Sequence, residues 1–321
     1  MKPIKFKPIL KETLWGGNKI AELKHIGGQS GRTIGESWEI SGVSGSESVA
    51  ADGDYEGHTL TEIVADMKDR LVGRENYMRF GNTFPLLIKF IDANQQLSVQ
   101  VHPDDKAAQR HGMKNGKTEM WYIMDSEPYA TLRCGLKTPL SAGQYADMVA
   151  DGTICDAIAE YNVKEGDCFF IPAGRVHSIG AGCFLAEIQQ TSDATYRIFD
   201  FNRLDKDGKP RQLHTHLAAE CIDYTVEDDY RTHYKAVKNK AALLATGKYF
   251  TTSVYDIDSA VTLDYSTLDS FVILIGMKGE ALLTGNDGCT TALRGGETLL
   301  VPATTASLRV EGTIKMIETY V

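Results

Sequence analysis

The sequence has no long hydrophobic run. Its most apolar run, residues 271–275, has the length of one buried strand, well short of the roughly 18 apolar residues of a membrane span. The basic residues at the start of the chain are not followed by the apolar core and cleavage site of a signal peptide. We therefore expect a protein that does not enter a membrane and stays in the cytoplasm.

The chain also lacks a cysteine framework. Its six cysteines contain no C-x-x-C pair, and their density is too low for a disulfide scaffold. This spacing predicts reduced thiols, as in a cytosolic protein.

Positive charge is in short supply as well. The chain has 34 Lys and Arg against 43 Asp and Glu, a net charge of −9. An acidic surface repels phosphate backbones and anionic lipids, which disfavours binding to nucleic acids and membranes. A small anionic substrate held by a few local cations is still compatible with this charge. We expect a monomer.

Helical patterns are sparse. Thr59 with Glu62 and Ser141 with Gln144 form capping boxes, which predict helices over residues 59–71 and 141–152. We also predict helices over residues 153–161 and 214–224. Short apolar runs separated by Gly and Asn/Asp turns predict strands at 84–92, 97–102, 120–124, 167–171, 184–190, 271–276 and 298–301. This pattern favours a mainly β sandwich or barrel.

The chain repeats itself weakly. Residues 162–173 resemble residues 292–303 at an offset of 130, with a glycine turn, an apolar strand and then Pro-Ala in both. Unless the likeness is chance, it indicates two related β-domains. Their boundary would lie where charge and alanine content rise, giving domains 1–236 and 237–321.

The clearest local pattern lies in residues 95–104. Polar and apolar residues alternate there, so Gln100 and His102 point to the same face of a strand, about 6–7 Å apart. A single Gln-x-His pair is by itself only a weak indication of a metal site.

Two further segments supply polar residues. Lys117 and Glu119 would share one strand face, and a solvated surface pair is the alternative interpretation. Residues 166–177 read as turn, strand, tight Pro-x-Gly turn and then His177, and the second turn would direct His177 back over the sheet.

These segments together resemble the two signature motifs of the cupin superfamily. The spacing Gly-x5-Pro-x-Gly-x2-His over residues 166–177 is that of the second motif, and Gln100-x-His102 with Glu119 resembles the first. Further segments are similar to type I mannose-6-phosphate isomerases of the short bacterial form: residues 14–17, 35–41, 100–104, 117–122 and 189–197. The resemblance implies a cupin jelly-roll barrel with helical elaborations and a second, degenerate cupin-like β-domain.

The resemblance also implies a metal site and a reaction. One zinc ion per chain would be held by Gln100, His102, Glu119 and His177, donors that suit zinc without excluding other divalent metals. The activity implied is the interconversion of mannose 6-phosphate and fructose 6-phosphate, so the partner is a sugar phosphate. A proton would move between C1 and C2 through a cis-enediol, with a metal or another cation stabilising the oxyanion.

Several candidates around the metal follow from the same resemblance. Arg197 would clamp the phosphate or stabilise the enediolate, and an ion pair with Asp193 or Asp200 is the alternative. Lys89 lies in an apolar strand and matches a pocket lysine, with snorkelling to solvent as the alternative.

Ser98, Lys117 and Glu187 complete the candidate set. Ser98 and Lys117 match pocket positions, and Lys117 could contact phosphate or shuttle a proton. Glu187 matches an active-site carboxylate, either as the base or as the residue that orients Arg197.

Two departures from the pattern matter. Ala181 stands where the cupin motif usually has Asn, which weakens only the general cupin likeness. Ser307 stands where the repeat would place a second His177, so the C-terminal domain is expected to be metal-free and to cover a sheet edge or pack beside the site.

Two other functions stay open. One is a different metallocupin enzyme, such as an iron-dependent dioxygenase, which commonly uses two His and one carboxylate. The other is a non-catalytic cupin that binds sugar phosphates. Gln100 as a fourth ligand, together with Lys89, Lys117 and Arg197, favours an anionic substrate over the oxygenase.

Overall fold

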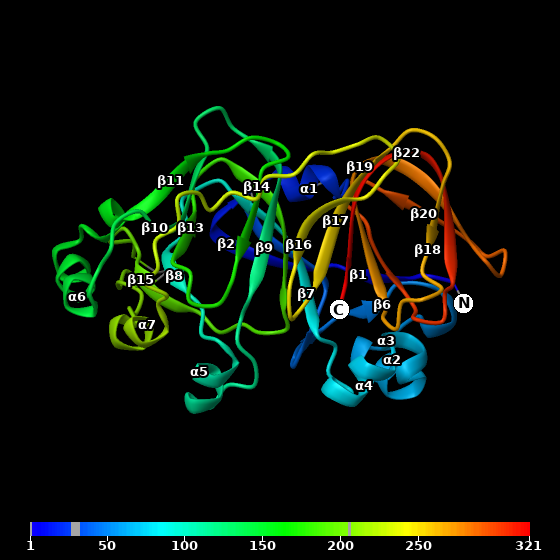
Figure 1. The fold of residues 1–321 in the computed structure, drawn as a ribbon, viewed down its shortest axis with the longest axis horizontal. Coiled ribbons are helices and arrows are strands. Elements are labelled where there is room, and N and C mark those ends of the chain that lie inside the picture. The colour runs from blue at the N-terminus through cyan, green and yellow to red at the C-terminus, as the bar shows by residue number, and fades with distance from the viewer. Residues whose placement is uncertain (1, 27–32, 205–206) are drawn as a thin grey trace.

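A computed structural model describes residues 2–26, 33–204 and 207–321. Figure 1 shows two strand-rich halves side by side, and the chain is mainly β, as predicted. Among the described residues, no helix is both long and apolar enough to cross a membrane. The six cysteines are free thiols, and three of them are buried: Cys134, Cys168 and Cys183.

Two antiparallel sheets face each other in the N-terminal half. One has the order β12 (Cys168–Ile171), β9 (Glu119–Ser126), β14 (Cys183–Gln190), β7 (Leu86–Ala93), β2 (Ile9–Gly17) and β3 (Ile34–Ile40). The other has the order β11 (Ile158–Asn162), β10 (Thr131–Leu136), β13 (His177–Ile179), β8 (Val99–Val101) and β15 (Tyr196–Phe199). Side chains of both sheets fill the core between them, including Trp121, Leu132, Phe169, Ile179 and Leu185.

One extended sheet organises the C-terminal half. Its order is β16 (Ala242–Thr246), β17 (Thr251–Ile257), β22 (Ser307–Tyr320), β19 (Val272–Gly285), β21 (Thr298–Val301), β1 (Ile4–Lys7) and β6 (Val49–Ala50). β18 (Val261–Asp264) pairs with β22, and β20 (Thr290–Arg294) pairs with β19. Strand β1 joins this sheet because Ile4 pairs with Leu300, so the N-terminal strand lies beside strands from the end of the chain.

The two halves repeat one strand order. The order β12-β9-β14-β7 in the first sheet corresponds to β21-β19-β22-β17 in the C-terminal sheet. The pairing registers agree as well. Trp121 of β9 lies between Phe169 of β12 and Glu187 of β14. In the C-terminal sheet, Leu274 of β19 lies in the same way between Leu299 of β21 and Glu318 of β22.

The short sequence repeat forms the same local structure twice. Strand β12 and strand β21 are offset by 130 residues, as the repeat predicts. The turns before them contain Gly166 and Gly296 with φ of 92° and 82°, a backbone region that glycine adopts readily. His177 begins β13, and Ser307 begins β22 at the equivalent place.

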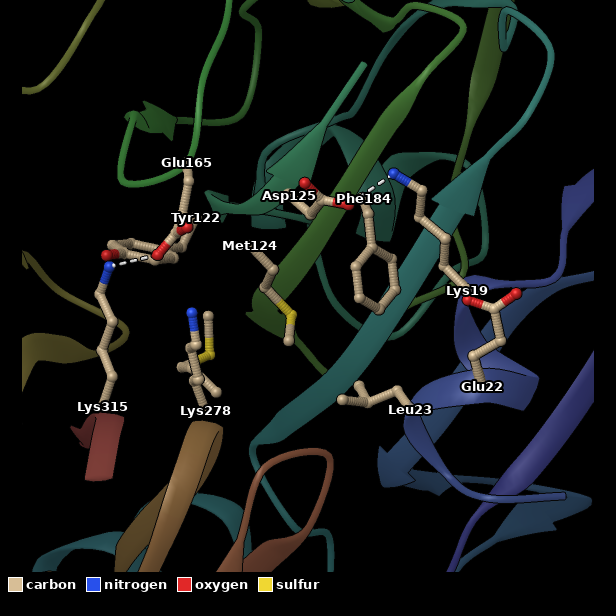
Figure 2. A pocket seen from close by; sticks show the side chains of 11 residues that line it. Lys19, Glu22, Leu23, Tyr122, Met124, Asp125, Glu165, Phe184, Lys278 and Lys315 are labelled. Carbon is tan, nitrogen blue, oxygen red and sulfur yellow. Dashed lines mark hydrogen bonds and ion pairs between the residues drawn. The ribbon is translucent and has the colours of Figure 1, made fainter. Parts of the chain in front are cut away.

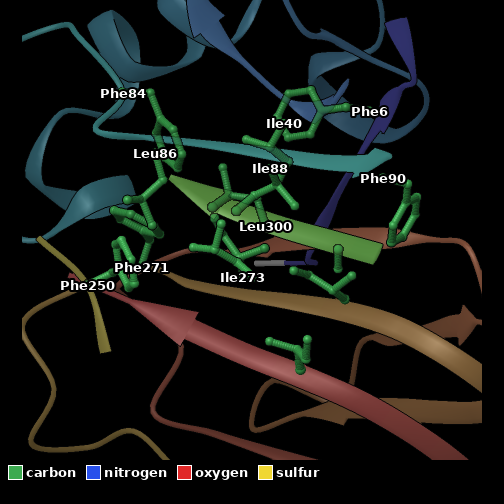
Figure 3. Close-up of a cluster of buried hydrophobic side chains, with 14 of the residues drawn as sticks. Phe6, Ile40, Phe84, Leu86, Ile88, Phe90, Phe250, Phe271, Ile273 and Leu300 are labelled. Atoms are coloured by element: carbon green, nitrogen blue, oxygen red, sulfur yellow. The ribbon is translucent and has the colours of Figure 1, made fainter. Parts of the chain in front are cut away.

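The two repeated sheets pack against each other. Figure 3 shows Ile88 of β7 close to Ile273 and Leu300 of the C-terminal sheet, and Leu86 and Phe90 belong to the same buried cluster. Strands β7, β9 and β14 are therefore covered on both faces, which is why they read as nearly continuous apolar runs. Three charged residues on these strands, Lys89, Glu119 and Glu187, point the other way, toward the core of the N-terminal half.

The helices are short and peripheral. They are α1 (Lys19–Leu23), α2 (Leu60–Met67), α3 (Asp69–Val72), α4 (Arg74–Phe80), α5 (Asp105–Arg110), α6 (Ala142–Asp151) and α7 (Thr215–Cys221), with 3₁₀ turns η1 (Gly53–Tyr55) and η2 (Ile154–Ala157). A small hairpin joins β4 (Gly42–Val43) to β5 (Ser46–Glu47). Both predicted capping boxes are present, at Thr59 and at Ser141.

Three helix predictions need correction. The helix predicted over 59–71 breaks at Lys68, whose φ of 55° ends α2 before α3 begins. Residues 153–161 form η2 and then β11, because Ile158–Asn162 pairs with β10 and takes its hydrogen bonds from the sheet. The helix predicted over 214–224 is shorter and forms α7.

A cavity of about 330 Å³ lies between the two halves, lined by α1, β9, β19 and β22 (Figure 2). Two ion pairs border it: Lys19 Nζ lies 2.6 Å from Asp125 Oδ2, and Lys315 Nζ lies 2.9 Å from Glu165 Oε1. Tyr122 of β9 lines the cavity, whereas its neighbour Trp121 lies in the core between the N-terminal sheets. The cavity is thus on the outer face of β9.

Candidate functional site

Four predicted metal ligands come together in the core of the N-terminal half. Gln100 is on β8, His102 directly follows it, and His177 begins β13, where it pairs with Gln100 across the two strands. Glu119 begins β9 in the facing sheet. The cluster therefore spans the space between the two sheets.

The donor atoms of this cluster are close together. His102 Nε2 lies 3.4 Å from Glu119 Oε2, and His177 Nε2 lies 3.4 Å from Glu119 Oε1. The amide nitrogen of Gln100 lies 3.2 Å from His177 Nε2, so a rotation of that amide would bring its oxygen to the same place. His102, Glu119 and His177 are all buried.

Hydrogen bonds at Nδ1 determine the tautomers of both histidines. His102 Nδ1 donates to the Ala194 carbonyl and His177 Nδ1 donates to the Arg175 carbonyl, each at 2.8 Å. A carbonyl only accepts, so Nδ1 carries the proton in both rings and Nε2 keeps its lone pair. Metal-binding histidines are usually oriented in this way.

These distances fit a single divalent cation. Two atoms that each lie about 2.1 Å from a tetrahedral ion are separated by about 3.4 Å, as the two His–Glu pairs are here. With one carboxylate among four donors, the site would keep net positive charge once a divalent ion is bound.

Electrostatics keeps the donors in their binding forms. Burial lowers the pKa of His102 to about 4 and also lowers the pKa of His177. Burial by itself would raise the pKa of Glu119, but Lys117 and the two histidines outweigh it and hold that pKa well below its usual range. At neutral pH the imidazoles are therefore neutral and the carboxylate is ionised.

Lys117 lies directly beside these donors, and Glu187 lies next to Lys117. Lys117 Nζ is 2.5 Å from Glu119 Oε2 and 3.1 Å from His102 Nε2. Glu187 accepts a hydrogen bond of 2.9 Å from Trp121 Nε1 and lies 3.7 Å from Lys117 Nζ. Lys117 and Glu119 are thus a buried pair, rather than a solvated surface pair.

Lys89 is paired inside the protein and does not snorkel to solvent. Its Nζ lies 3.3 Å from Glu187 and 3.7 Å from Glu36. Burial would lower the pKa of Lys89, but the charges of Glu36 and Glu187 reverse that effect and raise it.

Glu36 is a site residue that the sequence reasoning did not single out. Trp38 Nε1 donates to Glu36 Oε2 at 2.6 Å, and the Trp38 ring centre lies 5.1 Å from Lys89 Nζ. A signal was available: Glu36 and Trp38 stand two apart on a strand, inside a segment already noted for its resemblance.

Arg197 lies next to the cluster but apart from Glu187. On β15 it is opposite Gln100, and its Nη1 donates to the Gln212 carbonyl at 2.9 Å. The described contacts of Glu187 do not include Arg197. Asp200, the alternative partner of Arg197, is instead held by other arginines. Ser98 is buried and directly precedes β8.

Comparison with known proteins places this geometry in a family. Residues 4–131 match the family model "phosphomannose isomerase type I, catalytic domain", and residues 239–321 match "mannose-6-phosphate isomerase, cupin domain". Mannose-6-phosphate isomerase ManA of Bacillus subtilis (strain 168) is 31% identical over 97% of this chain and 96% of its own.

Two further comparisons agree. Mannose-6-phosphate isomerase of Streptococcus mutans is 30% identical over 99% of this chain and 98% of its own. The crystal structure of mannose 6-phosphate isomerase from Bacillus subtilis superposes with a TM-score of 0.89 at 30% identity, covering all of both chains. The chain belongs to the type I phosphomannose isomerase family.

Proposed function

We propose that this protein interconverts mannose 6-phosphate and fructose 6-phosphate. The observation that carries the proposal is the cluster of Gln100, His102, Glu119 and His177, with Lys117 in contact with Glu119 and Glu187 next to Lys117. An aldose and its ketose differ by a proton moved between C1 and C2, and this cluster combines a cation site with groups that can carry a proton.

We propose one zinc ion per chain, held by these four side chains. Imidazole and carboxylate donors at these separations support zinc, and the amide of Gln100 would add a neutral ligand. When bound, the ion would supply a Lewis acid that polarises the sugar oxygens at C1 and C2.

The side chains around the donors would transfer the proton, stabilise negative charge and contact the substrate. Lys117 and Glu187 lie 3.7 Å apart and are both candidates to carry the proton between C1 and C2. Arg197 would stabilise the enediolate or the phosphate from the opposite strand. Lys89 and Ser98 would line the substrate pocket.

We further propose that residues 1–236 carry the reaction. Every candidate site residue lies there. Residues 237–321 would form a metal-free domain that supports the outer faces of β7, β9 and β14. Free cysteines support a cytosolic location, and we propose that the chain acts as a monomer.

A coupled assay for fructose 6-phosphate tests the function. The chain is assayed with mannose 6-phosphate before chelation, after chelation, and after zinc is added back. We expect activity to disappear and return. Undiminished activity in fully demetallated protein would overturn the metal role, and oxygen uptake in place of isomerisation would favour the oxygenase.

A further inference from the structure

Strand β15 is the last strand of its sheet, so among the described residues one edge of its backbone has no neighbouring strand. Arg197 lies on this strand and pairs with Gln100 of β8 on the other edge. A backbone N–H and C=O on a free edge need partners from elsewhere in the chain. The segment that follows β15, residues 211–214, supplies those partners.

His214 meets Arg197 through two hydrogen bonds. The Arg197 amide donates to His214 Nδ1 at 3.0 Å, and the His214 amide donates to the Arg197 carbonyl at 2.8 Å. A third bond holds the side chain, because Arg197 Nη1 donates to the Gln212 carbonyl at 2.9 Å. Both the backbone and the guanidinium group of Arg197 are therefore held by residues 212–214.

A salt bridge keeps these two segments aligned. Asp200 stands three residues after Arg197, and Arg211 stands three residues before His214. Arg211 Nε and Nη2 donate to the two carboxylate oxygens of Asp200, at 2.7 and 2.5 Å. The segments therefore run antiparallel, with Arg197 opposite His214 and Asp200 opposite Arg211.

The His214 ring accepts a hydrogen bond only in its neutral form. Nδ1 accepts from an amide, so the ring proton is on Nε2, the reverse of the tautomer in His102 and His177. Burial and the positive charge of Arg197 both lower the pKa of His214, which favours the neutral ring. His214 is also the N-cap residue of α7, but its side chain makes no capping hydrogen bond. Its acceptor is thus directed to Arg197 and not to the helix.

Arg197 faces the side of the sheet that carries the candidate metal site. Its neighbours Tyr196 and Ile198 pack with Ala218 of α7 in a separate hydrophobic cluster. Side chains alternate along a strand, so Arg197 lies on the opposite face, which it shares with Gln100. Arg197 Nε is buried and has no hydrogen-bond partner among the described residues, which leaves a donor for a bound molecule.

We propose that His214 is a positioning residue for the isomerase reaction, because its ring holds the backbone from which Arg197 reaches the substrate. The inference rests on the proposed function, in which Arg197 stabilises developing negative charge. A donor acts on such a charge only from the right place, and a misplacement of about 1 Å can lower a rate about 100-fold. His214 would therefore affect the rate without touching the substrate.

Two substitutions of the same shape test the acceptor. Leucine and asparagine branch at the same atom, but only asparagine has an oxygen where His214 has Nδ1. We expect His214→Leu to lower kcat about 10–100-fold and His214→Asn to retain most of it. His216→Leu is the matched control, since it makes the same change at an exposed position of α7 and should leave kcat unchanged.

A double substitution separates positioning from a general effect on structure. If His214 acts through Arg197, His214→Leu should change kcat little in a chain that already carries Arg197→Ala. A general structural effect would instead lower kcat by the same factor in both backgrounds. That result, or equal activities of His214→Leu and His214→Asn, would overturn the inference.

Nitrogen-15 NMR of the histidine rings in the full chain tests the hydrogen bond without turnover. At neutral pH we expect His214 to carry its proton on Nε2, with its signals assigned by their loss in His214→Leu. An unsubstituted chain without isomerase activity would overturn the proposed function, and the positioning role with it. An active chain whose His214 ring is protonated at Nδ1 would overturn the positioning role alone.

Discussion

At the scale of single residues, the charges beside the metal donors alternate in sign. Glu36, Lys89, Glu187, Lys117 and Glu119 follow one another, with nitrogen–oxygen distances of 2.5 to 3.7 Å. Each of these charges is costly to bury alone and is tolerated because its neighbours balance it. The individual side chains therefore depend on one another for both position and ionisation.

Removing one histidine tests the metal cluster. We expect His177→Ala to lower zinc affinity about 100-fold or more, because it removes a ligand and leaves Glu119 with one His neighbour. Metal content per chain after dialysis against a weak chelator measures the effect. His233→Ala is the control, since His233 is exposed and paired with Asp229. Equal metal content in both variants would contradict the assignment.

Arg197 is expected to act on the reaction and not on the metal. Arg197→Ala should lower kcat about 10²–10³-fold, as is usual when a donor to a developing negative charge is lost. Its zinc content should stay at one per chain, because Arg197 meets Gln100 only through strand pairing and no described side-chain contact joins it to the four donors. Loss of metal together with activity would show that Arg197 is needed for the structure of the site.

At the scale of elements, the two repeats show how one local sequence serves in two surroundings. Gly166 and Gly296 both occupy turns with positive φ, where a Cβ is disfavoured. Around Gly166 an added Cβ would meet only Tyr234 Oη and Tyr122 Oη, at 3.4 and 3.8 Å. At Gly296 it would lie 2.7 Å from Leu23 Cγ.

This difference predicts unequal costs for the same substitution. Gly166→Ala should lower the free energy of unfolding by about 1–2 kcal/mol, the cost of the left-handed backbone alone. Gly296→Ala should cost more, because α1 must also move. Urea denaturation of the two variants measures the difference, and equal losses would contradict the role given to Leu23.

Helix α1 depends on a carboxylate from a strand. It has five residues, too few to be stable alone, and Asp92 of β7 accepts a hydrogen bond of 2.7 Å from the Lys19 amide. Burial raises the pKa of Asp92 to about 6. The folded chain therefore holds this proton more tightly than the unfolded chain does. The resulting stabilisation is fully present below about pH 4 and is lost as the pH rises through 6.

Replacing Asp92 with asparagine should remove this pH dependence. We expect the free energy of unfolding of Asp92→Asn, relative to the unsubstituted chain, to rise by on the order of 2 kcal/mol between pH 4.5 and pH 7.5. Urea denaturation at the two pH values measures it. A difference that stays constant with pH would show that Asp92 is ionised throughout.

At the scale of the whole molecule, the two halves share one hydrophobic cluster. Ile273 of β19 is fully buried in it, together with Ile88 of β7 and Leu300 of β21. Strand β1 adds a second link, because it pairs with β21. This arrangement predicts that the halves unfold together.

The positions of the tryptophans make that coupling measurable. All three, Trp15, Trp38 and Trp121, are in the N-terminal half. We expect Ile273→Ala to cost about 2–5 kcal/mol and to shift the unfolding midpoint seen by tryptophan fluorescence. Leu282→Ala, at an exposed position on the same strand, is the control. If the unfolding midpoint seen by circular dichroism shifted while the midpoint seen by tryptophan fluorescence did not, the two halves would unfold independently.

Much of this organisation can be read from local sequence. Short apolar runs between turns located seven of the strands, and capping boxes located two helices, because such runs and caps act within a few residues. The repeat at an offset of 130 residues located two equivalent strands. Resemblance to a known family, carried by local motifs, pointed to Gln100, His102, Glu119 and His177, and the structure brings these side chains within contact of one another.

Only the tertiary structure decided how those pieces meet. Strand pairing takes β1 into the C-terminal sheet and makes residues 158–162 a strand, and both depend on partners far away in the chain. The partners of Lys89 and Glu187, and the presence of Glu36 among them, likewise follow from register between strands. Local patterns carry no information on such distant neighbours, because a side chain's face is set by its own strand but its contacts are set by the next one.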